Sequence, residues 1–245
     1  MNLYGLIGYP LGHSFSKKYF TQKFEKEGLR DNFFELFPIK DIEEFTGLIQ
    51  SHPALKGLAV TIPYKQSVIP FLQSVSDEAM QIGAVNCIKI LPGECIGYNT
   101  DVLGFEKSFF SLLKPQHNKA LIFGSGGASK AVQFVLNKMM IPFLLVSRTQ
   151  VSTNTINYSD LDEATLQEYT IIINTSPIGM TPNENEMPAI PYQFIGSQHL
   201  LFDLIYQPSE TKFLAEGRSR GAAVKNGLDM LIIQAEENWK IWNSD

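Results

Sequence analysis

The segment Lys119–Leu136, KALIFGSGGASKAVQFVL, joins an apolar strand to an amphipathic helix through a glycine-rich turn. Gly124 permits a tight turn, Gly126 lets the backbone approach a pyrophosphate, and N–H groups at the start of the helix favour an anion. Gly127 follows, and Ser129 fills the third position, where it is small enough for close helix–strand packing. The segment predicts a Rossmann-like nucleotide-binding unit, with a glycine-rich turn that binds nothing as the alternative.

The next apolar strand, PFLLVSRT, distinguishes between the two nicotinamide cofactors. An NAD-binding domain usually ends this strand in Asp or Glu, which holds the ribose 2′-OH. Here the end reads Ser147, Arg148, Thr149. A guanidinium beside two hydroxyls fits a 2′-phosphate, so the pattern favours NADP; a solvated surface arginine is the alternative. Residues 150–164 begin without helical periodicity, which predicts a shortened or missing crossover helix.

Short apolar runs alternate with longer amphipathic segments along the chain, which is typical of α/β proteins with mainly parallel sheets. One connection differs, because LPGE between AVNCIKI and ECIGYN is too short for a crossover and predicts an antiparallel pair in a mixed sheet. We expect strands at 3–8, 32–38, 57–62, 84–90, 94–99, 119–124, 143–147, 170–175 and 199–206, and helices at 16–28, 41–50, 64–72, 101–113, 127–139, 209–219 and 228–243.

The 245 residues are enough for two ordinary domains. We expect an N-terminal, mixed but mainly parallel α/β domain over residues 1–100 and a Rossmann-like domain over 101–226. The last helix, at 227–245, follows the second domain in sequence but need not belong to it.

Composition favours a small-molecule partner. The net charge is −5 and Lys and Arg form no run, which argues against nucleic acid and anionic membrane surfaces. Cys87 and Cys95 are too few for a disulfide scaffold and lack a zinc-binding pattern, so we interpret both as buried thiols in a reducing compartment and expect no metal. Without a basic signal sequence or an apolar run of about 20 residues, we expect a cytoplasmic protein.

Polar residues follow several strands of the first domain. Thr61 and Lys65 come after GLAV, and Asn99 and Asp101 come after ECIGY, while Asn86 lies within AVNCIKI. Ligands of open α/β sheets bind outside the carboxyl ends of the strands, so these side chains are candidate ligand contacts. The alternative for Lys65 is an ordinary surface lysine.

The loop GYPLGHSFSKKYF points to an anion site. Ser14 and Ser16 lie at the start of a predicted helix, where hydroxyls and backbone N–H groups suit a carboxylate. The alternative is that one of the two serines is an N-cap.

Taken together, these motifs resemble the shikimate dehydrogenase family. The matching pieces run in family order over nearly the whole chain: GYPLGHSFS, VTIPYK, GAVN, GYNTD, GSGGAS, SRT, NTSPIGM, DLIYQPSETKFL and NGLDMLIIQA. Three positions depart from the usual pattern, because Ala59 replaces an Asn, Val102 replaces a Gly and Ser147 replaces the Asn of an NRT motif.

The resemblance implies a role for each matching position. Lys65 and Asp101 would be catalytic, with Lys65 either giving the proton or only orienting the carbonyl. The substrate would be held by Ser14 and Ser16 at its carboxylate, by Thr61, Asn86, Gln234, Lys65 and Asp101 at its hydroxyls, and by Tyr206 in the same cleft. NADP would be held by Gly124, Ser125, Gly126, Gly127, Ala128 and Ser129 at its pyrophosphate, by Ser147, Arg148 and Thr149 at its 2′-phosphate, and by Gly227 near the nicotinamide.

The implied activity is the reversible, NADPH-dependent reduction of 3-dehydroshikimate to shikimate, a step of aromatic amino acid biosynthesis. The final helix of this family returns to the first domain, and a monomer or homodimer is expected. Two alternatives stay open: a relative with relaxed use of quinate or NAD, and a non-catalytic relative that only binds NADP or a metabolite.

Overall fold

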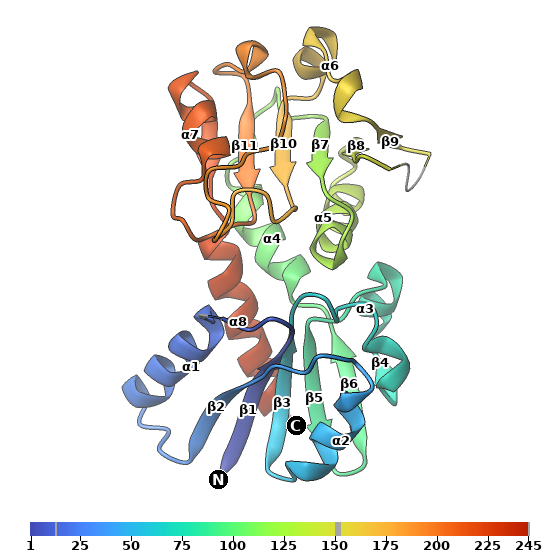
Figure 1. Cartoon of the computed structure of the whole chain (residues 1–245), viewed down its shortest axis with the longest axis vertical. Helices are drawn as coiled ribbons and strands as arrows, with labels where there is room; N and C mark the ends of the chain where they lie inside the picture. Colours follow the sequence, from blue (N-terminus) through green and yellow to red (C-terminus); the bar gives the residue numbers. More distant parts are fainter. Residues whose placement is uncertain (13, 150–152, 245) are drawn as a thin grey trace. The chain divides into compact units, whose positions relative to one another are not determined.

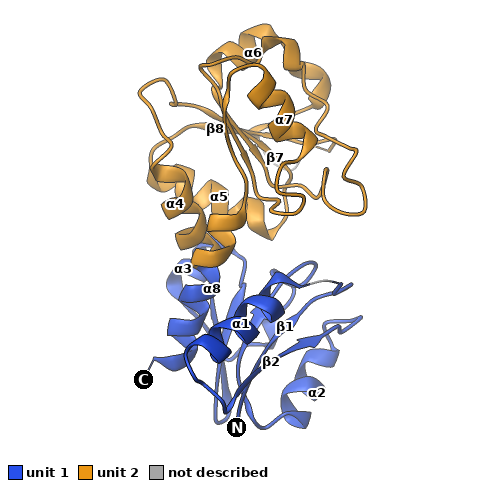
Figure 2. Cartoon of the chain, turned by 90° about the vertical axis from the view of Figure 1, so that its left-hand side faces the viewer, with its two compact units in different colours: residues 1–100, 234–245 blue, residues 101–233 orange. Residues whose placement is uncertain are grey.

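The computed structural model describes residues 1–12, 14–149 and 153–244. The chain divides into two compact units, where unit 1 is Met1–Thr100 with Gln234–Asp245 and unit 2 is Asp101–Ile233 (Figure 2). Unit 1 is therefore discontinuous in sequence, whereas unit 2 is one continuous segment. Each unit has its own six-stranded sheet.

The sheet of unit 1 is mixed, in the order β2-β1-β3-β5-β6-β4 (Figure 1). β1 is parallel to β2 and β3, whereas β5 is antiparallel to β3 and β6. The predicted antiparallel pair is thus confirmed, and Gly93, at φ +80°, lies in the turn between β5 and β6. The strands are β1 (Asn2–Ile7), β2 (Asn32–Phe37), β3 (Leu55–Val60), β4 (Ser74–Val75), β5 (Cys87–Leu91) and β6 (Glu94–Tyr98).

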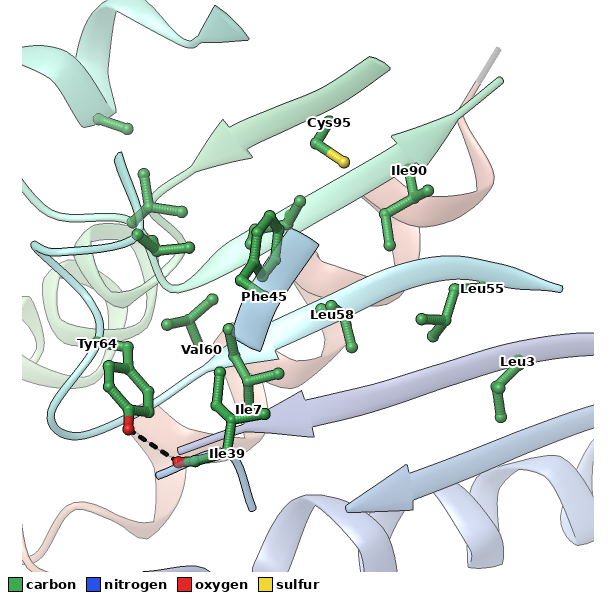
Figure 3. Packing of buried hydrophobic residues seen from close by; sticks show 14 residues of the cluster. Leu3, Ile7, Ile39, Phe45, Leu55, Leu58, Val60, Tyr64, Ile90 and Cys95 are labelled. Atoms are coloured by element: carbon green, nitrogen blue, oxygen red, sulfur yellow. Dashed lines mark hydrogen bonds between the residues drawn. The ribbon is translucent and has the colours of Figure 1, made fainter. Parts of the chain in front are cut away.

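Alternate residues of these strands enter two separate hydrophobic cores, as the two-residue period of a strand requires. Leu3 and Ile7 of β1 join the first core, in which the Tyr64 hydroxyl donates to the Ile39 carbonyl at 2.8 Å (Figure 3). Residues of α2 and α3, such as Phe45, complete this core. The helices that supply residues to unit 1 are α1 (Phe15–Lys26), α2 (Glu44–Ser51), α3 (Asp77–Ile82) and the C-terminal part of α8 (Leu228–Asn243).

The second core of unit 1 is an aromatic cluster that joins α1 and α8 to the sheet. The Tyr4 ring of β1 stacks on Trp242 with centroids 5.2 Å apart, and Phe20 of α1 lies 5.3 Å from the same indole. The indole N–H donates to the Ile88 carbonyl at 3.0 Å. A Cβ at Gly57 would collide with the indole ring, so only glycine allows this approach.

The prediction of a helix over residues 64–72 is wrong. This segment forms successive turns and ends in a short 3-10 helix, Ile69–Phe71. Its backbone bonds are mainly of the i to i−3 type, as from Tyr64 to Thr61 and from Phe71 to Val68. Pro70 lacks an N–H and cannot take part in an α-helical ladder, which explains the failure.

The sheet of unit 2 is entirely parallel, in the order β12-β11-β10-β7-β8-β9. Figure 1 labels the strands from β11 to β9. Numbered from β7, this sheet has the 3-2-1-4-5-6 order of doubly wound dinucleotide-binding folds. The predicted fold class is therefore confirmed. The strands are β7 (Ala120–Phe123), β8 (Phe143–Val146), β9 (Thr155–Ile156), β10 (Ile171–Asn174), β11 (Leu200–Asp203) and β12 (Ala223–Lys225).

Helices pack on both faces of the unit 2 sheet. On one face, Phe105 and Phe109 stack at 4.8 Å and meet Phe202 of β11 edge to face. The other face holds a core that includes Leu166 and Phe213. The helices are α4 (Asp101–Phe110), α5 (Gly127–Lys138), α6 (Glu163–Glu168) and α7 (Lys212–Ser219). Between β9 and β10 the chain forms only a 3-10 turn and the six-residue α6, so the expected shortened crossover is confirmed within the described residues.

The two cysteines behave as expected from composition. Cys87 and Cys95 are both buried and free, and burial raises the pKa of each thiol. Across the residues that the structure describes, no helix has the length and apolar character needed to span a bilayer.

Candidate active site

Polar residues of unit 1 meet at the carboxyl edge of its parallel strands. Thr61 follows β3 directly, and its N–H donates to the Ile7 carbonyl at 3.0 Å. Asn86 precedes β5, but because β5 is antiparallel to β3 it lies at the same edge, where its carbonyl accepts from Val60 N at 2.8 Å. Its own N–H donates to the Tyr98 carbonyl at 3.0 Å. The antiparallel register therefore brings Asn86 to the predicted ligand-binding edge.

Lys65 lies in the turns after β3 and is half-buried. Its carbonyl accepts from Val85 N at 2.7 Å, which fixes its backbone beside the segment that carries Asn86. Asp101 is the first residue of α4, in unit 2, and is buried. The Asn99 side-chain amide donates to the Ala84 carbonyl at 2.9 Å and so stabilises the backbone at this edge of the sheet.

The predicted anion site lies at the start of α1. Ser14 is the N-cap of α1, and its hydroxyl accepts from Lys17 N at 3.4 Å. Accepting a cap bond uses a lone pair and leaves the O–H able to donate to a carboxylate. Ser16 lies in the first turn, which holds no acidic side chain. The N-cap alternative thus applies to Ser14 without excluding an anion.

Gln234 joins the same group of residues from the far end of the sequence. Asn86 Nδ2 donates to Gln234 Oε1 at 3.3 Å, and both side chains are buried. The C-terminal part of α8 therefore delivers Gln234 to unit 1, where the resemblance places the substrate.

The glycine-rich turn of unit 2 fits a pyrophosphate. Gly124 has φ +105°, a conformation that side-chain-bearing residues rarely adopt. Gly126 is the N-cap of α5 and has no side chain to satisfy the first N–H groups of that helix, and a Cβ there would meet nothing within 4 Å. Ser129 is fully buried and donates to the Gly124 carbonyl at 2.8 Å, so its hydroxyl braces the turn. Ser125, Gly127 and Ala128 complete the turn and the start of α5.

Thr175 lies at the point where the strand order of unit 2 reverses, between β7 and β10. Its hydroxyl donates to the Phe123 carbonyl at 2.8 Å, and a Cβ on Gly124 would come within 2.8 Å of the same hydroxyl oxygen. Ligands of doubly wound folds bind at this reversal. Sequence reasoning assigned Thr175 no role, although the motif NTSPIGM after an apolar strand carried the signal.

Arg148 is exposed at the end of β8, as a 2′-phosphate ligand requires. Thr149 N donates to Ser147 Oγ at 3.3 Å, which orders the turn around the arginine. Burial raises the pKa of the Tyr158 phenol, and the positive charge of Arg148 partly offsets this rise. Tyr158 is thus a neighbour of Arg148 that sequence reasoning missed.

Asp203 holds the segment that follows β11. Although no solvent reaches this carboxylate, it accepts hydrogen bonds from Thr211 Oγ1 at 2.6 Å, Ile205 N at 3.0 Å and Asn174 Nδ2 at 3.1 Å. Burial raises its pKa to about 6, and the three hydrogen bonds oppose the rise. These bonds fix the chain just before Tyr206, a predicted substrate residue.

Gly227 lies against the same segment of unit 2. Its N–H donates to the Ile205 carbonyl at 3.0 Å, and a Cβ would collide with the Leu204 carbonyl. Only glycine permits this close approach of two backbones, which explains the glycine at a position predicted to lie near the nicotinamide.

Comparisons with known proteins agree with this geometry. Residues 6–88 match the family described as shikimate dehydrogenase substrate binding domain. Shikimate dehydrogenase (NADP(+)) of Staphylococcus aureus strain Newman is 36% identical over 98% of this chain and 92% of its own length. The crystal structure of shikimate dehydrogenase from Aquifex aeolicus is 34% identical, with TM-score 0.88 over 99% of this chain and 92% of that one. The Thermus thermophilus enzyme, solved in complex with NADP(H) and shikimate, is 27% identical, with TM-score 0.87 over 99% and 94% of the two chains.

The parallel sheet of unit 2 and its glycine-rich turn have the form of a dinucleotide-binding domain. Together with the relatives, they identify the chain as a two-unit, NADP-dependent oxidoreductase. The chain belongs to the shikimate dehydrogenase family. The predicted family, enzyme class and NADP dependence are therefore confirmed, and the roles of individual residues stay predictions.

Proposed function

We propose that this protein reduces 3-dehydroshikimate to shikimate, with unit 1 binding the substrate and unit 2 binding NADPH. The observation that carries the proposal is the meeting of Thr61, Asn86 and Gln234 at the carboxyl edge of one sheet, with the Lys65 turn fixed beside them. Amides, a hydroxyl and an ammonium are the groups that recognise a polyhydroxylated ring and its carbonyl.

Lys65 is our candidate for the proton donor. NADPH, when bound, supplies the hydride that reduces the carbonyl carbon of the substrate. The carbonyl oxygen then gains electron density and takes one proton, which a lysine ammonium can give. Asp101 would orient the ammonium and balance its charge, and solvent would return the proton after each turnover. In the oxidation of shikimate the same groups act in reverse.

The substrate carboxylate would bind at the start of α1. Ser14 and Ser16 offer hydroxyls there, and the N-terminal end of a 12-residue helix favours negative charge. Tyr206 would line the same cleft.

NADP would bind at the carboxyl ends of β7, β8 and β10. The first turn of α5 would hold the pyrophosphate, because its N–H groups have no side-chain cap. Arg148, with Ser147 and Thr149, would hold the 2′-phosphate, and Gly227 would lie near the nicotinamide. A guanidinium discriminates NADP from NAD because it pairs with a phosphate dianion that NAD lacks.

The test is a steady-state assay of shikimate and quinate, each with NADP and with NAD. We expect the highest kcat/KM for shikimate with NADP. Comparable values for quinate or NAD would favour a relaxed relative, and tight binding without turnover would favour a non-catalytic one.

We further propose that the enzyme acts in the cytoplasm as a monomer or homodimer. The two unpaired, buried cysteines support a reducing compartment. Cell fractionation and light scattering would test the two statements separately.

A further inference from the structure

Four buried polar side chains of unit 1 form one hydrogen-bond network. They come from the residue before β5, from the segment after β6, and from α8, and the exposed fraction of each is 7% or less: Asn86, Thr100, Gln234 and Asn238. A buried network of amides and hydroxyls is strongly constrained, because each unsatisfied group would cost free energy. Two of its members, Thr100 and Asn238, have no role in the proposed function.

A single backbone N–H determines the orientation of the network. Thr100 N donates to the Asn86 side chain at 2.7 Å. A backbone N–H can only donate, so the atom it meets must be Oδ1 of Asn86 and not Nδ2. Asn86 Nδ2 therefore faces the other way, where it donates to Thr100 Oγ1 at 3.0 Å and to Gln234 Oε1 at 3.3 Å.

The direction of the Asn86 hydrogen bonds also determines which atoms donate and accept at Thr100 and at the residues of α8. Because the Thr100 hydroxyl accepts from Asn86, it gives its one hydrogen to another acceptor, and Asn238 Oδ1 at 2.6 Å is closer than Asn86 Oδ1 at 3.3 Å. Asn238 Nδ2 then points to Gln234 Oε1 at 3.3 Å. Gln234 Oε1 thus receives N–H groups from both asparagines, which fixes this oxygen toward the network and its NH2 group on the opposite side.

We propose that Asn238 and Thr100 are positioning residues that make Gln234 a hydrogen-bond donor to the substrate. This rests on the proposed function, in which Gln234 meets a ring hydroxyl. With its oxygen held by two N–H groups, Gln234 presents N–H to the oxygen of that hydroxyl. The network therefore selects a substrate atom that accepts at this position, and Asn238 acts on that atom through its hydrogen bond to Gln234.

Asn238→Asp tests the orientation with almost no change of shape. A carboxylate still accepts from Thr100 but cannot donate to Gln234, so the Gln234 amide loses one of the two bonds that fix it. We expect KM for shikimate to rise about tenfold, the loss of one oriented hydrogen bond, while KM for NADP stays at its wild-type value. Asn243→Asp is the matched control, because it makes the same change at an exposed residue of the same helix and should leave both KM values unchanged.

Thr100 supplies a second pair of variants. Thr100→Val keeps the shape but removes the hydroxyl, so Asn238 loses the donor that sets its orientation and Asn86 loses one acceptor. KM for shikimate should therefore rise by at least a similar factor. Thr100→Ser keeps the hydroxyl and should restore a KM near wild type. The double variant Thr100→Val with Asn238→Asp should be no worse than the poorer single variant, because both break the same chain of bonds.

The outcomes separate this inference from the proposed function. Absence of shikimate turnover by the wild-type protein would overturn the proposed function, and calorimetric titration with shikimate would then test the network by affinity alone. Wild-type KM and affinity in both Asn238→Asp and Thr100→Val, with only a lower free energy of unfolding, would overturn the positioning role. A rise in KM that Thr100→Ser does not reverse would also contradict it.

Discussion

The Cα of Gly57 lies directly against the indole ring of Trp242, leaving no space for even one methyl group between β3 and α8. The indole N–H is held by the Ile88 carbonyl at 3.0 Å, so the ring cannot move aside without losing that bond. This contact fixes how closely α8 approaches the sheet of unit 1.

Gly57→Ala should therefore destabilise the protein. Overpacking of a core by one methyl group costs about 1–3 kcal/mol, which lowers Tm by several degrees in a chain of this length. Gly47→Ala is the control, because a Cβ at this position meets nothing within 4 Å. Gly47 lies inside α2, where alanine is a better helix former than glycine, so this variant should not lose stability. Thermal unfolding of the two variants checks this prediction. Equal Tm values for Gly57→Ala and Gly47→Ala would contradict the tight contact at Gly57.

Lys65→Ala should lower kcat by about 10²–10⁴ with a modest change in KM, since a positioned proton donor acts in the transition state. Lys56→Ala, an exposed lysine of β3, is the matched control and should keep wild-type rates. Steady-state kinetics with shikimate and NADP measure both. Turnover near wild type in Lys65→Ala would remove Lys65 from the proton transfer.

Arg148→Ala should weaken the binding of NADP without weakening the binding of NAD. Losing a charge-assisted contact to the 2′-phosphate should raise KM for NADP about 10- to 100-fold, whereas NAD has no group there to lose. Arg218→Ala, an exposed arginine of α7 that pairs with Glu210, should change neither value. Equal rises for both cofactors would assign Arg148 a structural role instead.

Asp203 should make stability depend on pH below neutrality. Its raised pKa means that the folded protein keeps the proton up to about pH 6, while the unfolded chain releases it near its ordinary value of 3.8. Its contribution is thus fully present below about pH 4 and is lost as pH rises through 6.

The change Asp203→Asn removes this dependence. Relative to the variant, the wild-type free energy of unfolding should fall by on the order of 2–3 kcal/mol between about pH 4 and pH 7. Urea unfolding at several pH values measures the difference, with Asp229→Asn, an exposed carboxylate of α8, as the control for lost charge. A constant difference between wild type and Asp203→Asn would contradict the raised pKa.

Long elements could be predicted from the sequence because periodicity is visible over many residues. The 16-residue helix α8 is an example. The antiparallel pair β5–β6 was predictable for another reason, because the connection LPGE is too short for a crossover. The missed elements are short, with two residues each in β4 and β9, three in β12 and six each in α3 and α6, which is too few for a period to show. The prediction of a helix over residues 64–72 was wrong because the apolar spacing is helical but Pro70 cannot donate a backbone hydrogen bond.

Candidate site residues could be proposed from the sequence where a polar residue ends an apolar strand, as with Thr61 and Arg148, and their roles stay predictions. Their supporting partners were not, because hydrogen bonds such as that between Thr100 and Asn238 join positions 138 residues apart. Asn238 lies one helical turn after Gln234, and nothing in the local sequence distinguishes it from a solvated residue of an amphipathic helix.

The discontinuity of unit 1 has a consequence for biosynthesis. A ribosome makes the first hundred residues of unit 1 and then all of unit 2 before it adds the part of α8 that carries Trp242. The nascent unit 1 therefore lacks the part of its aromatic core that α8 supplies, while the continuous unit 2 can already fold as it emerges. A stop codon before Trp242 would leave the aromatic residues that α8 covers exposed, so a chain truncated within α8 should aggregate and be degraded.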